Sequence, residues 1–532
     1  MKSKKIVSLF ILFLAIGYSN SVSSQNQLDY KVMMGYQGWF LAPGDGSTTN
    51  NPWNHWFRGG TAATPDAANL TVDMWPDMSE YTDKFNTNMT YANGSNAQLF
   101  SSYSLSTTRK HFEWMSNYNV HGIYLQRFLS AVELQTSGMF RAKNKVLNNV
   151  MTSAAEYNRK YAVMYDVSGV TDATMYAKIV ADWEYLVNTY DILNRPEYVK
   201  QNGKPVVAIW GIGFKDRGLT SATSQAIIDY FKTNAAPKYR AYVMGGVPEG
   251  WRTLSGSSET GTDWSAVYNS LDMISPWSVG RYSTNSGADS FKTNNIVPDL
   301  AACNNNNKDY MPVIWPGFSW KNLKSNSTPP SIETLNTIPR NGGQFYWRQA
   351  YNAVQAGVKF IYVAMFDEVD EGTAMFKITD ITANLPIQAN DRLVSLDIDG
   401  VNLPSDWYLR LADQSQKMLN GTIPLTRNIP ITPPFTLAGN GAEFITQQNS
   451  LTIYPNPADS EIYINFSLPE PSDVGISIIN YMGQLVLQNS DKKKLDSGGH
   501  TIKVLVESLS KGVYLARIII NNRVFVRKVI IE

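Results

Sequence analysis

Short, nearly continuous apolar runs recur along the chain up to about residue 366, and longer segments with helical spacing separate them. Strands that are buried on both faces, as in a parallel sheet, need continuous apolar runs rather than strict alternation. The eight runs begin at Lys31, Val120, Tyr161, Lys204, Ala241, Met273, Tyr310 and Val358. Helical spacing is found in segments such as 106–119, 173–190, 221–234 and 342–357, and again at 405–419. This alternation predicts an α/β fold, a (β/α)8 TIM-like barrel.

A long polar segment interrupts the alternation after the first predicted strand. Residues 42–107 are rich in Asn, Gly, Pro and Trp. Connections of this length in a compact domain are usually functional or disordered, and the tryptophans favour an ordered segment. We expect it to fold over the mouth of the barrel and to form one wall of a cleft.

Both ends of the chain differ from this pattern. The N-terminal MKSKK, followed by IVSLFILFLAIGY and SNSVSSQ, predicts a secretory signal peptide, and its apolar stretch is short for a membrane span. After Gly421 the chain becomes rich in Pro, Thr and Gly, which is typical of a linker, and from Leu451 short strand candidates predict a small all-β, immunoglobulin-like sandwich. The expected organisation is a signal peptide (1–25), a barrel (26–421), a linker (422–446) and a sandwich (447–532).

Composition narrows the range of partners. The 46 basic and 45 acidic residues nearly cancel, so no broad electrostatic field indicates binding to nucleic acid or to an acidic membrane. The single cysteine, Cys303, excludes an intrachain disulfide. We expect an exported, soluble protein with a neutral or weakly charged ligand and no transmembrane segment.

The predicted strand ends carry the candidate binding residues, because the carboxyl ends of barrel strands converge on one mouth. Aromatic, guanidinium and carboxylate side chains together suit a polyhydroxylated ligand such as a sugar. The predicted substrate-binding residues are Tyr36, Trp39, Arg127, Asp166, Trp210, Trp277, Trp315 and Asp367. Alternatives stay open at this point: an arginine of this kind also pairs structurally with acids, Asp166 is also a candidate helix cap, and tryptophans are also core residues. His55, in the long polar segment, is a further candidate contact.

The stretch FDEVDEGT, residues 366–373, places four carboxylates directly behind the last apolar run. Crowded carboxylates repel one another and are costly to desolvate, so such a cluster holds a cation, is solvated, or performs acid and base chemistry. Glycoside cleavage needs one carboxylic acid and a second carboxylate. We predict Glu368 and Glu371 as the catalytic pair, without a metal or another cofactor. A solvated acidic loop and a structural calcium ion, held here or at residues 397–400, are the alternatives, although neither stretch has EF-hand spacing.

The motif DEVDEGT resembles the E-x-x-E-G-T element of glycoside hydrolase family 99, the endo-α-mannosidases and endomannanases, and of the wider family 71/99-like group. MGYQGWF, WPGFSW and the run from Arg340 to Gln349 resemble the same group, so the resemblance spans residues 28–420. It implies that Glu368 deprotonates the sugar 2-hydroxyl to form a 1,2-anhydro sugar and that Glu371 is the general acid and base, with retention of configuration. Val369 and Asp370 replace the aromatic and polar residues usual in family 99, which favours the looser group, whose activities need not be mannosidic.

The C-terminal part has a resemblance of its own. LTIYPNPADSEIYINF, IINYMGQLV, LSKGVYLARI and VFVRKVIIE resemble the C-terminal sorting domain of the type IX secretion system of Bacteroidota. This resemblance implies export by that machinery across the outer membrane, followed by release or surface attachment. A carbohydrate-binding sandwich is the alternative, but all 14 tryptophans lie between Trp39 and Trp407, outside this tail.

These observations predict a secreted glycoside hydrolase that cleaves α-linked polysaccharide, internally and with retention. The alternatives are a non-catalytic glycan-binding barrel and an exo-acting enzyme of the xylosidase or arabinosidase type.

Overall fold

The computed structural model describes residues 26–132, 135–325, 333–433, 451–468, 470–480, 485–520 and 523–532. The predicted signal peptide, residues 1–25, and residues 434–446 of the predicted linker lie outside the described residues.

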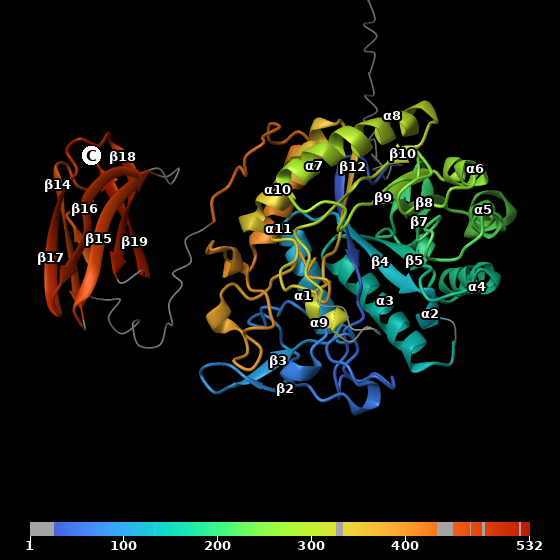
Figure 1. Ribbon diagram of the computed structural model, residues 1–532, viewed down its shortest axis with the longest axis horizontal. Helices are drawn as coiled ribbons and strands as arrows, with labels where there is room; N and C mark the ends of the chain where they lie inside the picture. The colour runs from blue at the N-terminus through green and yellow to red at the C-terminus, as the bar shows by residue number, and fades with distance from the viewer. Residues whose placement is uncertain are drawn as a thin grey trace, which may run out of the picture.

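A parallel sheet forms the centre of the body (Figure 1). Its strands follow the order β10-β9-β8-β7-β5-β4-β1-β12-β11. They are β1 (Lys31–Tyr36), β4 (Gly122–Phe128), β5 (Lys160–Asp166), β7 (Lys204–Trp210), β8 (Tyr242–Pro248), β9 (Met273–Trp277), β10 (Asp309–Tyr310), β11 (Val313–Ile314) and β12 (Phe360–Val363). The short β6 (Lys200–Gln201) pairs with β7 in the antiparallel direction.

The barrel closes through one interrupted strand. β10 pairs with β9 and β11 pairs with β12, both in parallel, and only two residues separate β10 from β11 along the chain. The two pieces therefore occupy one strand position, which brings the sheet to eight positions at the eight predicted apolar runs. The predicted (β/α)8 barrel is confirmed.

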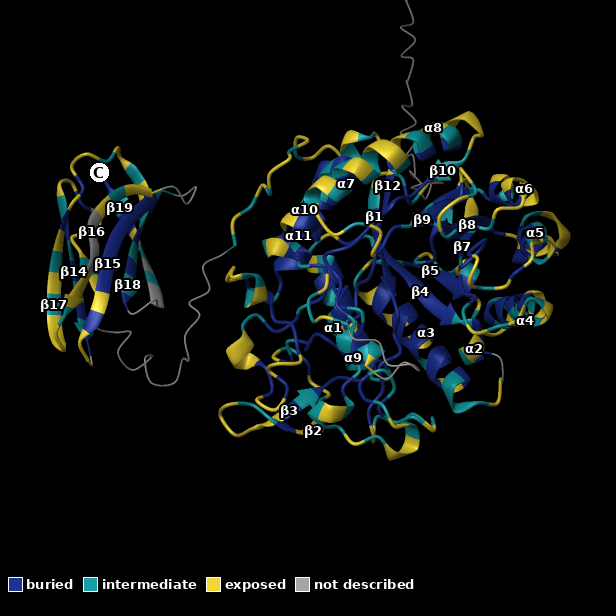
Figure 2. Cartoon of the chain, in the orientation of Figure 1, coloured by how far each residue is buried: buried dark blue, intermediate teal, exposed yellow. Residues whose placement is uncertain are grey.

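Helices surround these strands (Figure 1). They are α1 (Leu105–Asn117), α2 (Leu129–Val132), α3 (Gly138–Glu156), α4 (Asp172–Tyr190), α5 (Ser221–Asp229), α6 (Asp263–Ser270), α7 (Asn285–Phe291), α8 (Val297–Asn305), α9 (Lys321–Lys324), α10 (Gln344–Gln355) and α11 (Trp407–Leu419). Local sequence sets several helix starts; the Ser137 hydroxyl, for example, accepts the amide of Phe140 and caps α3. Figure 2 shows that the strands are buried, whereas the outer faces of the helices are exposed.

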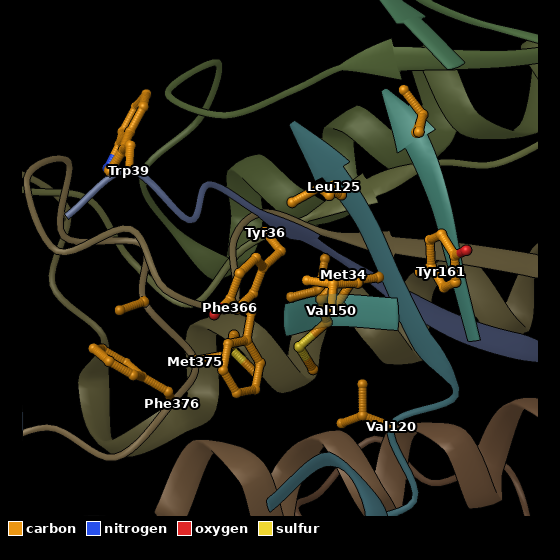
Figure 3. Close-up of a cluster of buried hydrophobic side chains, with 14 of the residues drawn as sticks. Met34, Tyr36, Trp39, Val120, Leu125, Val150, Tyr161, Phe366, Met375 and Phe376 are labelled. Atoms are coloured by element: carbon orange, nitrogen blue, oxygen red, sulfur yellow. The ribbon is translucent and has the colours of Figure 1, made fainter. Parts of the chain in front are cut away.

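Two apolar layers lie on the two faces of the barrel strands. Met33 and Tyr124 belong to the layer inside the barrel, whereas Met34 and Leu125 belong to the layer between strands and helices. Figure 3 shows part of this outer layer. Because successive strand residues point to opposite faces, this alternation continues to the strand ends and decides which side chains reach the mouth.

The long segment after β1 is ordered, as expected. It contains the hairpin of β2 (Phe85–Thr90) and β3 (Asn96–Leu99). Its buried Asp73 accepts hydrogen bonds from the Ser319 hydroxyl at 2.6 Å, the Lys321 amide at 2.7 Å and the Asn322 amide at 2.8 Å. The segment therefore holds the loop that follows β11.

The C-terminal region forms two antiparallel sheets around a separate apolar core. One sheet has the order β13-β14-β17 and the other β16-β15-β18-β19. The strands are β13 (Thr452–Tyr454), β14 (Glu461–Leu468), β15 (Ser472–Asn480), β16 (Leu485–Leu495), β17 (Gly498–Leu505), β18 (Gly512–Ile520) and β19 (Arg523–Ile531). The small β-sandwich is confirmed.

Candidate active site

A cleft of about 940 Å³ opens at the carboxyl ends of the barrel strands. Of the predicted site residues, six line it: Trp39, Asp166, Trp210, Trp277, Glu368 and Glu371. From the long segment after β1 only His55 reaches the cleft, so this segment contributes one contact rather than the whole wall that the sequence suggested.

Asp367 joins the first and last strands of the barrel. It is fully buried, and its carboxylate accepts the amides of Gln37 at 2.7 Å and Gly38 at 2.9 Å. Burial raises its pKa to about 6. The prediction that Asp367 binds substrate is corrected: the carboxylate is fully engaged beneath the cleft and holds the two strand ends together.

Glu368 and Glu371 lie together in the cleft. The Gln37 side chain donates to Glu368 from Nε2 at 3.0 Å. Burial raises the pKa of Glu368 well above its usual value, and the charges of Glu371 and Asp370 raise it further. Burial, followed by the charge of Asp370, raises the pKa of the partly buried Glu371 to about 7. Like charges this close do not both ionise easily, so the pair retains a proton near neutral pH.

The turn that carries Glu371 is fixed from behind. The Ser319 amide donates to the Glu371 carbonyl at 2.9 Å. The buried Arg340 donates to the carbonyls of Gly372 at 2.9 Å and Ala374 at 2.7 Å. Gly372 has a φ of +64°, and a Cβ there would lie 2.8 Å from the Ser319 nitrogen. The glycine of E-x-x-E-G-T is therefore required by a left-handed backbone and by close packing.

Asp370 and Trp39 both contact His55. The His55 Nδ1 lies 2.8 Å from Oδ2 of Asp370, which is buried. The imidazole also stacks on Trp39, with centroids 3.6 Å apart and an interplanar angle of 4°. One face of the Trp39 indole is therefore covered, and a sugar ring cannot stack on that face.

Aromatic rings and an acid form the part of the cleft contributed by β5, β7 and β9. Trp210 and Trp277 meet edge to face, with centroids 5.4 Å apart. The Arg217 guanidinium lies 5.3 Å from the Trp210 centroid. Asp166 accepts the Ser168 amide at 2.8 Å, and burial raises its pKa to about 6. Asp166 precedes α4 by several residues, so it caps no helix there.

Three predicted binding residues lie in the core instead, and these predictions are corrected. The Tyr36 hydroxyl lies 2.9 Å from Nδ1 of the buried His111. The Tyr36 ring packs near Phe366 in the outer apolar layer (Figure 3). Arg127 forms a buried pair with Asp182 of α4, at 2.6 Å and 2.8 Å. Trp315 is fully buried against Tyr282 and Phe345, with centroid distances of 4.5 Å and 5.5 Å.

Several cleft residues were not predicted as site residues. Gln37 and Gln126 occupy inward positions at two strand ends, and each keeps a buried Oε1 without a hydrogen-bond partner. Phe214, Arg217 and Trp320 line the cleft from loops after strands. Unpartnered buried oxygens at a cleft are groups that a hydroxyl-rich ligand can satisfy.

The calcium alternative concerns the acidic stretches 366–373 and 397–400. Within the described ranges, no group of three or more His, Cys, Asp or Glu side chains is arranged to hold a metal ion. Asp397 accepts hydrogen bonds from Thr382 and Ser395, and Asp399 accepts them from Asn336 and Asn341.

Comparison with known proteins identifies the tail and the fold of the body. Residues 452–532 match the family described as secretion system C-terminal sorting domain. The body resembles the structure of the GH99 endo-α-mannosidase from Bacteroides thetaiotaomicron, alone and in complex with BIS-TRIS-propane. In both cases the identity is 15%, the TM-score is 0.51, and the match covers 74% of this chain and 98% of the other. The fold thus agrees with the family resemblance of the motifs.

Two further findings concern known sequences and the lengths of the helices. No curated protein sequence matches it. Over the residues that the structure describes, no helix combines the length and the apolar character needed to cross a bilayer. The sorting domain indicates export by a type IX system.

Proposed function

We propose that the body is a glycoside hydrolase that cleaves α-linked polysaccharide, with Glu368 and Glu371 as its catalytic pair. One observation carries the proposal: two carboxylates share a cleft at the end of the last barrel strand. Burial raises the pKa of both, and the charge of Glu371 raises that of Glu368 further. Glycoside cleavage requires one carboxylic acid that donates a proton and a second carboxyl that acts in its ionised form. The fold, which is that of a GH99 endo-α-mannosidase, supports the same conclusion.

The resemblance of the E-x-x-E-G-T element to family 99 gives each glutamate its role in the proposed reaction. Glu368, as a carboxylate, takes the proton of the sugar 2-hydroxyl, and that oxygen attacks the anomeric carbon while the glycosidic C–O bond breaks. Glu371 gives its proton to the departing oxygen. Glu371 then takes a proton from water, which opens the 1,2-anhydro ring, and Glu368 returns its proton to the sugar oxygen. Two displacements at the anomeric carbon give net retention.

Substrate binding determines where the shared proton lies. In the empty cleft, burial favours the proton on Glu368, the more enclosed of the two. A sugar hydroxyl that donates to Glu368, in addition to the Gln37 amide, stabilises its carboxylate form. The proton then resides on Glu371, which is the state the first step needs.

The cleft supports internal cleavage. Its volume of about 940 Å³ exceeds the space of one sugar ring, and Trp210, Trp277 and Trp320 line it from different strand ends. We therefore propose an endo-acting enzyme. Val369, where family 99 has an aromatic residue, leaves α-mannans as one substrate class among several α-linked polymers.

We further propose that the chain is exported by its signal peptide, residues 1–25, and then across the outer membrane by the type IX machinery, with residues 422–446 as a linker. The sorting domain supports this route. The product is released or attached to the cell surface.

The test is product analysis with purified protein and a panel of α-mannans, α-glucans, arabinans and algal polysaccharides. An endo-acting glycosidase releases a ladder of oligosaccharides and new reducing ends from one of them. Monosaccharides alone would favour the exo-acting alternative. Binding to a polymer without any release would favour the non-catalytic glycan-binding barrel.

A further inference from the structure

Asp370 is a buried carboxylate between the two catalytic glutamates in sequence. Its side chain is 2% exposed, and one oxygen, Oδ1, is buried without a hydrogen-bond partner. It does not line the cleft, so it does not reach the substrate. A buried charge of this kind is costly unless it is held by a partner or serves a purpose.

His55 is the partner that holds this carboxylate. It comes from the long segment after β1, 315 residues away in sequence, and contacts Oδ2 at 2.8 Å. Its position is fixed from two further sides: its ring stacks on Trp39, and its carbonyl accepts the Thr71 hydroxyl at 2.5 Å. Its φ of 62° lies in the left-handed region, which is unusual for a residue other than glycine. A strained backbone that is held at a cleft by three contacts indicates a functional constraint.

We propose that Asp370, held by His55, is a positioning residue whose fixed negative charge retains the one proton of the Glu368–Glu371 pair at neutral pH. This inference rests on the proposed function. Asp370 acts on the glutamates through its charge, and the contact with His55 at 2.8 Å holds its carboxylate in place. In agreement with this role, the charge of Asp370 raises the pKa of both Glu368 and Glu371.

The other charged groups around the pair do not replace Asp370. Asp166 raises the pKa of Glu371, as Asp370 does, whereas Lys324 lowers the pKa of Glu371. Asp367 raises the pKa of Glu368 more weakly than Asp370 does. Lys143 is buried, its charge acts to lower the pKa of Asp367, and it donates to the Gln37 carbonyl at 3.0 Å. Among these charged groups, Asp370 has the largest effect on the pKa of Glu371.

The experiment compares the pH dependence of kcat/KM for the parent, Asp370→Asn and Asp391→Asn. Asp370→Asn keeps the shape of the side chain but removes its charge. We expect the basic limb of the profile to move about one pH unit lower, because the pair loses its proton more easily without the nearby negative charge. Asp391 is exposed and distant from the cleft lining, so its variant should leave the profile unchanged.

Two variants of His55 separate positioning from mere support. His55→Phe keeps a ring against Trp39 but removes the contact that holds the Asp370 carboxylate in place, so we expect the basic limb to move in the same direction as in Asp370→Asn. His55→Asn tolerates the left-handed backbone and restores a donor, and we expect it to bring the limb back toward the parent position. The inference is overturned if the basic limb of the kcat/KM profile lies at the same pH in the parent, in Asp370→Asn and in His55→Phe.

A direct titration keeps this test independent of turnover. The 13C NMR signal of Glu371 in protein labelled at the glutamate carboxyl carbon is assigned by its loss in Glu371→Gln. In Asp370→Asn this signal should titrate about one pH unit lower than in the parent. If no polysaccharide is cleaved by the parent, the proposed function fails while this titration still decides the role of Asp370; an unshifted titration refutes that role alone.

Discussion

The Gln37 side chain donates a hydrogen bond from Nε2 to Oε2 of Glu368 at 3.0 Å and so connects the end of the first barrel strand with the acidic segment after the last. Beneath this bond, Asp367 accepts the amides of Gln37 and Gly38. The two hydrogen bonds from backbone amides to Asp367 thus set the position of the neighbouring Glu368. They also place the Gln37 side chain, which stabilises the charge of Glu368. The two ends of the barrel sequence meet at Glu368, the proposed base.

Replacing Gln37 with Leu removes this donor. The hydrogen bond favours the carboxylate form of Glu368, so its loss raises the pKa of Glu368 further above the usual value. The reaction needs that carboxylate as a base, and we expect kcat/KM at pH 7 to fall about tenfold or more, with the acidic limb moved to higher pH. A pH profile of kcat/KM checks this. An acidic limb at the parent's position would show that Glu368 is not the base.

Trp277 provides an open aromatic surface to the substrate. It is partly exposed in the cleft, whereas Trp315 is fully buried outside it. Trp277→Ala should raise KM about tenfold with a small change in kcat, because it removes roughly 1–2 kcal/mol of apolar contact with a sugar. Steady-state kinetics measure both constants.

The matched comparison is Trp315→Phe, which should lower the melting temperature and leave KM unchanged. An equal rise of KM in both variants would attribute the effect to general loosening of the body.

Gly372 sets the conformation of the turn after Glu371. An alanine there meets a φ of +64° and places Cβ 2.8 Å from the Ser319 nitrogen. Gly372→Ala should therefore displace the Glu371 turn, reduce kcat more than tenfold and destabilise the fold by about 1–3 kcal/mol. Kinetics and thermal unfolding measure the two effects.

Gly357 offers a control with the same backbone strain. Its φ is +88°, but nothing lies within 4 Å of a Cβ built there. Gly357→Ala should cost stability alone and keep kcat at the parent's value. Loss of kcat in the Gly357 variant to the same degree would contradict the steric argument.

The cleft carboxyls Glu368 and Glu371 are expected to lower stability at neutral and alkaline pH. A carboxyl whose folded pKa lies above its unfolded value binds more protons when folded, so stability falls as pH rises toward the folded pKa, which is about 7 for Glu371. Glu371→Gln removes this penalty. We expect the variant to be more stable than the parent at pH 8 by about 1–2 kcal/mol, after allowance for solvent screening of this partly exposed group, and to gain less at pH 5. Thermal unfolding at the two pH values measures the difference; a larger gain at pH 5 would reverse the sign of the argument.

The sequence predicted the barrel well because its strands are long apolar runs at regular intervals. It predicted the carboxylates for a related reason, since four acids directly after an apolar run are costly to bury unless they are held by partners or serve a function. Glu368 and Glu371 do line the cleft, whereas Asp367 accepts hydrogen bonds from backbone amides at the end of the first strand.

The errors at Tyr36, Arg127 and Trp315 share a physical cause. Strands buried on both faces are apolar on both faces, so the sequence pattern does not say which residues point into the barrel. At the end of β4 the inward residue is Gln126, while its neighbour Arg127 faces Asp182 on a helix. The structure shows which strand-end residues point inward. They include Gln37 and Gln126, which line the cleft but were not among the predicted substrate-binding residues.

The contact between His55 and Asp370 could not be predicted from the sequence. The two residues are separated by 315 positions, and neither lies in a pattern that requires the other. Only the fold of the long segment after β1 brings His55 to the last strand.

The most direct test of the central claim measures reducing ends released from the polysaccharide panel by the parent and by Glu371→Gln at pH 7, with affinity for the same polymers measured in parallel. The account predicts release by the parent from an α-linked polymer, at least a hundredfold less release by Glu371→Gln, and retained affinity in the variant. Equal release by the two proteins, or no release by the parent from any polymer that it binds, would contradict it.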